Sequence, residues 1–167
     1  MIGYLKGTVV FSQEREIIIL TDGGTGYLVS VTPQVAAAQS QGDIVELFIE
    51  TSVREDAIVL FGFPKMEERK LFNLLREVNK IGPKTALSIL SSGTAEEIGF
   101  AIASGNAGFF KKISGVGQKT AERIIIDLKE KWVTSLLKGA ERSLLIQTET
   151  LSMHRKGFLP LDTILFR

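Results

Sequence analysis

The chain has 167 residues, of which 44% are hydrophobic and 23% charged, a composition that excludes disordered, collagenous and coiled-coil proteins. Its formal net charge of +1 gives no sign of a nucleic-acid-binding protein, and the absence of cysteine excludes disulfide frameworks and thiolate zinc sites. The longest apolar runs fall far short of the roughly 20 residues that a membrane span needs, and we expect no signal peptide, because Met1–Thr8 has the pattern of a strand.

Residues 1–63 have the pattern of short β-strands. The predicted strands are rich in β-branched and aromatic residues and are separated by turn-forming segments, among them Ser12–Glu14. A short helix is expected near Val35–Gln39. This pattern predicts a small closed or partly open β-barrel, with a compact sandwich as the alternative. The predicted strands are Gly3–Val10, Ile17–Thr21, Gly26–Val31, Asp43–Thr51 and Ala57–Phe63.

From Pro64 onward the apolar residues have helical spacing. Pro83 suits the first turn of a helix, and Thr94 with Glu97 forms a capping box. The fold class is therefore α+β and multidomain, with a barrel followed by an all-helical domain. The predicted helices are Met66–Val78, Pro83–Leu90, Thr94 to about Ala103, and Gln118–Trp132.

The charge changes sign along the chain. Residues 1–63 contain three bases and eight acids, a net charge of −5, whereas residues 64–132 contain twelve bases and eight acids, a net charge of +4. Residues 133–167 have a net charge of +2 from five bases and three acids. We therefore expect three segments with these bounds, a barrel, a helical domain and a tail, and at least the first two have different roles.

An internal repeat with an offset of 35 residues lies within the helical domain. Lys80–Ala86 aligns with Gly115–Ala121, and both copies keep the pattern Gly-x-Lys-Thr-Ala. Each copy predicts a helix, a tight glycine turn and a second helix, whose free N–H groups and dipole attract anions. Lys84 and Lys119 add a positive charge two residues after the glycine.

No acidic residue occurs in Val78–Ala95 or in Ile98–Ala121, so nothing local repels a phosphate. One such unit could equally be a packing corner between helices, but two copies that keep the same residues favour phosphate binding. Backbone N–H groups and lysines contact phosphates rather than base edges. The repeat therefore predicts sequence-independent, salt-sensitive binding of nucleic acid.

This repeat is the helix-hairpin-helix pattern, and two copies behind a β-barrel resemble the RuvA family, whose members bind Holliday junctions. The resemblance covers residues 1–132. The motifs that carry it, besides the repeat, are Met1–Gly7, Gly24–Tyr27, Val53–Ala57, Leu60–Phe63, Glu68-Arg69, Leu71-Phe72 and Lys119–Arg123.

The resemblance implies an OB (oligonucleotide/oligosaccharide-binding) barrel, a tandem helix-hairpin-helix domain, and a homotetramer that holds four-way junction DNA, with one or two tetramers per junction. It implies a bacterial cytoplasmic protein with the hexameric ATPase RuvB and the resolvase RuvC as partners. We expect no cofactor and no catalytic site. The expected DNA-binding residues are Asn79, Lys80, Ile81, Gly82, Pro83, Lys84, Ser114, Gly115, Val116, Gly117, Gln118, Lys119, Thr120 and Arg123.

Glu55 and Asp56 lie between two predicted strands, at a hairpin tip. By themselves they fit a solvated turn. The resemblance implies that they form an acidic pin beneath the crossover, where eight carboxylates from four subunits would repel backbone phosphates and hold the junction open.

Two features depart from the family pattern. Lys80 stands where the first hairpin of the family has a glycine, which restricts the backbone or adds a phosphate contact. Residues 133–167, with one expected helix at about Thr134–Gln147, are too few for the family's linker and three-helix ATPase-binding domain. We therefore expect that domain to be absent, truncated or replaced.

Two other functions compete with junction binding. The helix-hairpin-helix units could serve a repair nuclease or glycosylase, for which Asp127 is the candidate catalytic acid, although no catalytic lysine accompanies it. A single-strand binder that uses the barrel would need exposed aromatics interleaved with bases, which the acidic first module lacks. His154 has no His or Cys partner, so no metal site is expected.

Overall fold

The computed structural model describes residues 1–134, of which residues 1–129 form one compact unit. Residues 130–134, the described part of a second unit, are helical. The expectations for the tail fall almost entirely on residues 135–167, which lie outside the described residues. Among the described helices, none combines the length and the hydropathy needed to cross a membrane.

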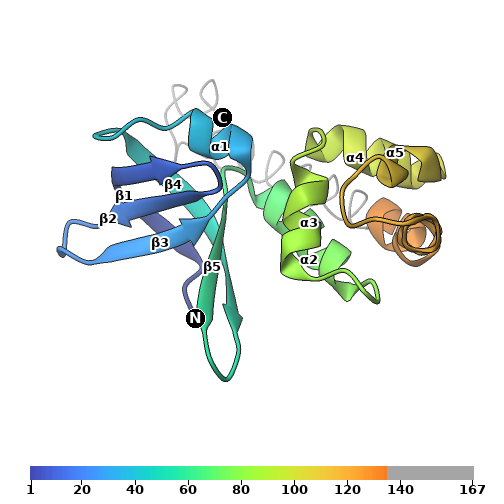
Figure 1. The fold of residues 1–167 in the computed structure, drawn as a ribbon, viewed down its shortest axis with the longest axis horizontal. Coiled ribbons are helices and arrows are strands. Elements are labelled where there is room, and N and C mark those ends of the chain that lie inside the picture. Colours follow the sequence, from blue (N-terminus) through green and yellow to red (C-terminus); the bar gives the residue numbers. More distant parts are fainter. Residues whose placement is uncertain (135–167) are drawn as a thin grey trace, which may run out of the picture. The chain divides into compact units, whose positions relative to one another are not determined.

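Residues 4–63 form a closed five-stranded barrel in the order β1-β2-β3-β5-β4 (Figure 1). Neighbouring strands are antiparallel except for the parallel pair β3–β5, and the pairing of β1 with β4 closes the barrel. The predicted barrel is therefore confirmed, and the sandwich alternative is wrong. The strands are β1 Tyr4–Gln13, β2 Glu16–Leu20, β3 Gly26–Ser30, β4 Ile44–Val53 and β5 Ile58–Phe63.

The turn predicted at Ser12–Glu14 is confirmed at Glu14 and is wrong for Ser12 and Gln13, which belong to β1. Ser12 pairs with Ile17, and β1 runs on to Gln13, so only Glu14 and Arg15 remain in the turn. Similarly, β4 extends beyond Thr51 to Val53. Polar residues continue the ladder at Ser12, Gln13 and Ser52, because backbone pairing does not require an apolar side chain.

The barrel core consists of side chains that alternate along the strands, as a half-buried sheet requires. Helix α1, Pro33–Ala37, begins two residues earlier than expected, because Thr32 caps it by accepting from the Val35 N–H at 3.4 Å. Gly62 is needed for packing, since a Cβ there would lie 2.7 Å from a Leu47 methyl group. The core residues include Leu5, Val9, Ile17, Ile19, Val29, Val31, Val45, Leu47, Ile49 and Leu60.

The helical part of the unit follows the barrel directly. The capping box at Thr94 is confirmed, with Thr94 and Glu97 exchanging side-chain and backbone hydrogen bonds. A short helix precedes the second hairpin and is capped by Asn106, whose side chain accepts from the Phe109 N–H at 3.2 Å. The helices are α2 Met66–Glu77, α3 Pro83–Leu90, α4 Ala95–Ala103 and α5 Ala107–Lys111, followed by helical residues 118–129.

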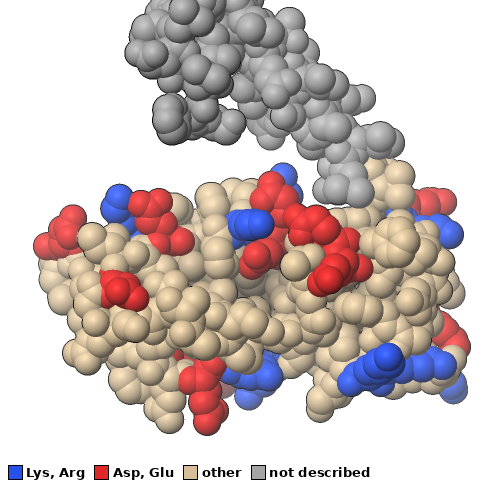
Figure 2. Space-filling model, turned by 90° about the horizontal axis from the view of Figure 1, so that it is seen from above, with Lys and Arg blue, Asp and Glu red and all other residues tan. Residues whose placement is uncertain are grey.

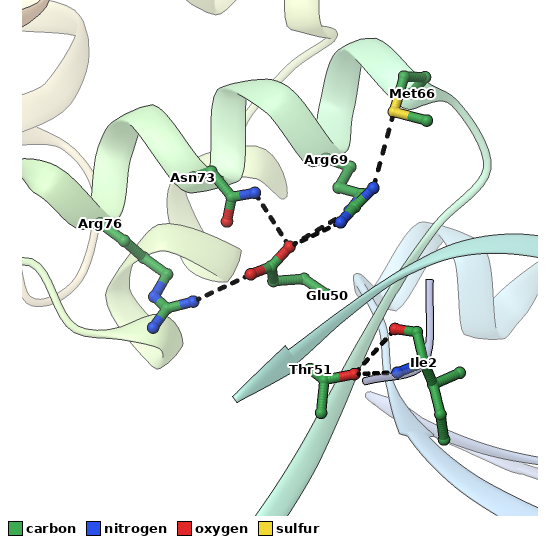
Figure 3. A network of polar contacts seen from close by, with 7 residues as sticks. All are labelled: Ile2, Glu50, Thr51, Met66, Arg69, Asn73 and Arg76. Atoms are coloured by element: carbon green, nitrogen blue, oxygen red, sulfur yellow. Dashed lines mark hydrogen bonds and ion pairs between the residues drawn. The ribbon is translucent and has the colours of Figure 1, made fainter. Parts of the chain in front are cut away.

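Helix α2 is fixed to the barrel by apolar and polar contacts. The Phe72 ring packs on Phe61 and Phe63, with ring centroids 5.0 and 4.9 Å apart. Beside these rings, Glu50 of β4 accepts hydrogen bonds from the side chains of Arg69, at 3.2 Å, and Asn73, at 3.0 Å (Figure 3).

A second basic residue of α2 and two contacts of α3 complete this junction. Arg76 Nη1 lies 3.7 Å from Glu50 Oε1. Gln34 donates to the carbonyl oxygen of Ser91 at 2.8 Å, and Arg15 donates to the hydroxyl of Ser88 at 3.3 Å. The barrel thus holds both helices that flank the first hairpin.

Candidate nucleic-acid interface

The two predicted hairpins share an unusual backbone conformation at equivalent positions. Lys80 has φ 73° and Gly115, 35 residues later, has φ 86°. Both values lie in the left-handed region, which glycine enters freely and lysine does not. The first hairpin therefore keeps the geometry of the second despite the departure from glycine, at a cost in backbone strain.

The hydrogen bonds of the turns repeat with the same offset. The Ile81 N–H donates to the Val78 carbonyl at 3.0 Å, and the Val116 N–H donates to the Ile113 carbonyl at 3.0 Å. Ile81 and Val116 are buried, each 5% exposed. Each turn is thus anchored by one buried apolar side chain. Ile81 and Val116 can therefore contact a ligand only through their backbone atoms.

A glycine precedes the second helix of each hairpin, although neither the backbone conformation nor the packing requires glycine there. Gly82 has φ −85°, an ordinary value for any residue, and Gly117 does not have the left-handed backbone that favours glycine. A Cβ at either position would meet no heavy atom within 4 Å. The missing side chain therefore serves neither turn geometry nor packing, and it leaves room for a ligand to approach the backbone.

The first turns of the two second helices begin in the same way. The Ala86 N–H donates to the Gly82 carbonyl, and the Ala121 N–H donates to the Gly117 carbonyl, both at 2.9 Å. The N–H groups ahead of these bonds have no partner inside the helix, so they are available to an anion. Pro83 supplies no N–H, but its ring suits the first helical turn.

Lysine and arginine side chains surround the hairpins. Lys80, Lys84, Lys119 and Arg123 are exposed, and none forms an ion pair with another residue of the described chain. Over the helical part, Figure 2 shows basic side chains gathered in a band along one edge, with acidic side chains mostly elsewhere on that face. Unpaired cations of this kind attract a polyanion.

The hairpins lie next to each other. A Cβ on Gly115 would lie 3.7 Å from the Thr85 hydroxyl in the first turn of α3. The structure thus brings the two halves of the repeat together, as a single backbone-binding surface requires.

The other expected DNA-binding residues differ in their surroundings. Asn79 and Ser114 are exposed, and Thr120 is half-buried. The Gln118 side-chain amide donates to the Glu122 carboxylate, so this amide N–H already has a partner within the helix.

Sequence reasoning missed Lys111 and Lys112, which are exposed immediately before the second hairpin. The signal was available, because both lie in the acid-free segment Ile98–Ala121. They add two exposed positive charges to the segment that leads into the second hairpin.

Glu55 and Asp56 occupy the tip of the β4–β5 hairpin, whose turn projects beyond the neighbouring strand ends (Figure 1). The Arg54 N–H donates to the Ala57 carbonyl at 2.8 Å and closes the turn. Both acids are exposed, and no ion pair within residues 1–134 neutralises them. The tip therefore presents two exposed carboxylates on a hairpin turn that is closed by a backbone hydrogen bond.

Comparison with known proteins gives two family matches that together cover most of the described chain. The family described as RuvA N terminal domain matches residues 1–62. The family described as SAM-like Helix-hairpin-helix tandem matches residues 72–130. These two ranges correspond to the barrel and to the helical part.

Curated relatives are similar over the same region. The chain is 46% identical over 132 residues to the Holliday junction branch migration complex subunit RuvA of Solidesulfovibrio magneticus, covering 78% of this chain and 65% of that protein. It is 48% identical over 131 residues to the protein of the same name from Rickettsia felis, with 78% and 64% covered. For the Rickettsia akari protein the values are 46% over 140 residues, with 84% and 68% covered. The chain thus spans slightly less than two thirds of the length of the first two relatives.

Proposed function

The chain belongs to the RuvA family, and from this premise we propose that it is a non-catalytic, sequence-independent subunit that recognises four-way junction DNA and holds it open for branch migration. The observation that carries the proposal is the repeated hairpin, with similar backbone geometry, glycines whose Cβ position is open, and lysines without an ion pair in both copies. The names of the relatives support the choice of a junction as the substrate.

In this proposal the hairpins bind the duplex arms through phosphates. The free N–H groups at the starts of the two second helices donate to phosphate oxygens, and Gly82 and Gly117 let the strand approach the backbone. Lys84 and Lys119 neutralise the phosphates and release counterions. None of these groups reads a base edge, so binding is independent of sequence.

The acidic tip has the opposite electrostatic role. Glu55 and Asp56 repel the phosphates of strands that converge at the crossover, while the basic hairpins hold the arms. A protein with both elements prefers an open junction to a straight duplex, because only the open junction satisfies the hairpins without forcing phosphates onto the tip.

The assembly follows from the symmetry of the substrate. We propose a homotetramer in which each chain holds one arm, with the RuvB ATPase supplying energy for branch migration and RuvC as a further partner. Residues 1–63 provide the acidic tip, and residues 64–132 provide the hairpins that bind the duplex arms. The site needs no cofactor, and the working location is the bacterial cytoplasm.

A binding comparison tests this function. A four-way junction, a linear duplex of equal arm length and a single strand are each titrated with the chain at matched salt with Mg²⁺ present. Junction preference without cleavage is expected. A nicked or base-excised product would instead favour the nuclease or glycosylase alternative, and preference for the single strand would contradict the proposal.

A further inference from the structure

A groove of about 560 Å³ lies between the barrel and the first hairpin. One side is the start of α3, with Gly82 and Lys84, and the other is formed by the β1–β2 turn and the end of β4. Its size falls in the range of pockets that bind small molecules and cofactors, about 300 to 1,000 Å³, and is too small for a duplex.

Three basic side chains from three separate elements line this groove. Arg15 comes from the β1–β2 turn, Arg54 from the end of β4 and Lys84 from α3. Arg15 is oriented by its hydrogen bond to Ser88, whereas Arg54 and Lys84 form no ion pair within the described part of the chain. Glu16 is the single acidic residue in the lining, so the groove is cationic.

The base of the groove is a row of side chains across adjacent strands. Ser30 of β3 pairs with Glu16 of β2 on one side and with Phe61 of β5 on the other, and Ser52 of β4 pairs with Val59 of β5. Hydroxyl groups and apolar side chains therefore alternate beneath the cationic walls. Such a lining suits a sugar–phosphate unit, which presents both apolar and hydrogen-bonding groups.

The groove connects the two elements of the proposed interface. Its lining includes Gly82 and Lys84 of the first hairpin and Arg54, the residue before the acidic tip. A strand that leaves a base-paired arm at the hairpin and turns toward the tip therefore passes the groove. A strand in a straight duplex does not leave the arm.

We propose that this groove binds the phosphodiester backbone of the single strand that passes from a duplex arm to the crossover, with Arg15 and Arg54 as the additional phosphate contacts. The inference rests on the proposed junction binding and deepens it, because it assigns a part of the preference for branched DNA to a separate site. Lys84 then lies at the edge of both the hairpin that binds the duplex arm and the groove that binds the single strand.

The test compares Arg54→Gln with Lys70→Gln, which removes the same charge from an exposed position on α2 outside the groove. Fluorescence anisotropy with a labelled junction, a blunt duplex and a forked duplex with two single-stranded tails gives Kd for each. For Arg54→Gln we expect about a fivefold to tenfold weaker Kd on junction and fork, less than a twofold change on the blunt duplex, and a salt slope lower by about one. Equal losses on all three DNAs, or no loss on the branched ones, would overturn the inference.

A second measurement identifies the phosphate itself. Methylphosphonate replacement of the phosphates next to the branch point removes their charge. On this DNA Arg54→Gln should weaken Kd little further, because both changes delete the same contact. An undiminished effect of Arg54→Gln on the neutralised DNA would overturn the assignment. If the parent protein shows no preference for a junction over a blunt duplex, the proposed function fails, whereas the forked duplex still decides whether the groove binds a strand.

Discussion

Lys80 and Gly115 are equivalent residues of the two hairpins, and both hold the left-handed backbone, with φ of 73° and 86°. A side chain in this conformation costs roughly 1 kcal/mol, which glycine avoids, although glycine also loses more entropy on folding. The first hairpin therefore stores strain that the second does not.

This strain predicts the effects of two opposite substitutions. Lys80→Gly should raise the free energy of unfolding by about 0.5 kcal/mol, whereas Gly115→Ala should lower it by about 1 kcal/mol, as measured by urea unfolding. A Cβ on Gly115 would make only ordinary van der Waals contact with Thr85, so crowding does not confuse the comparison. Destabilisation by Lys80→Gly would show that the lysine side chain makes stabilising contacts that outweigh its strain.

The bare glycines predict a loss of binding without a loss of stability. Gly82→Ala combined with Gly117→Ala should leave the urea midpoint within error, because each Cβ enters open space in the free protein. The affinity for a linear duplex should fall at least about tenfold, since the methyl groups occupy the position of the approaching phosphates. Gly3→Ala is the matched control, as its Cβ also meets nothing within 4 Å but lies on the barrel. Unchanged affinity in the double variant would refute close approach at the hairpins.

The lysines predict a change in salt dependence. Lys84→Ala with Lys119→Ala should lower the slope of log Kd against log salt by about two, because each lost phosphate contact removes close to one released counterion. Lys65→Ala with Lys70→Ala removes the same charge from α2 and its start, and it should leave the slope nearly unchanged. A slope that falls equally in both variants would mean that overall charge, rather than the hairpins, drives binding.

The Glu50 contacts predict a stability effect that the sequence does not reveal. The Glu50 side chain is 17% exposed and interacts with Arg69 and Arg76 of α2, which are 23% and 31% exposed. Glu50→Gln should lower the free energy of unfolding by about 2 kcal/mol, because it leaves two largely desolvated arginines without a counter-charge. Glu46→Gln, which breaks an exposed pair with Lys6, should have no measurable effect. Equal urea midpoints for both variants would contradict this account of the barrel–helix junction.

The elements that could be predicted from the sequence are those whose side chains repeat with a regular period. Ile17 and Ile19 alternate inward in β2, and the capping residues Thr94 and Glu97 mark the start of α4. Helix α5 has only five residues and includes Gly108, so its helical propensity is weak and the cap at Asn106 is the main signal for it.

The groove could not be predicted, because its cationic residues come from turns far apart in the chain. Arg15 and Arg54 are isolated bases in an acidic module; Arg15 belongs to no motif, and the motif Val53–Ala57 that contains Arg54 draws attention to its two acids instead. They meet Lys84 only because β3 pairs in parallel with β5 and α2 packs on the barrel through Phe72. Periodicity describes local structure, whereas this site depends on tertiary packing.

The acidic tip predicts an electrostatic effect specific to branched DNA. Glu55→Gln with Asp56→Gln should keep or tighten junction binding, because removing negative charge near converging phosphates lowers their repulsion. The open, square arrangement of the arms should become less populated, which fluorescence energy transfer between labelled arms measures. Linear duplex affinity should not change.

Two acids in turns elsewhere on the barrel provide the control for this prediction. Glu14→Gln with Asp22→Asn removes the same charge from exposed positions away from the tip. If long-range charge alone governs binding, the control should tighten junction binding as much as the tip variant does, and arm geometry should not distinguish the two. If the tip acts at the crossover, only the tip variant alters the arm geometry, because screening at about 0.15 M salt confines the repulsion to roughly 8 Å. Unaltered affinity and unaltered geometry in the tip variant would mean that Glu55 and Asp56 form only a solvated turn.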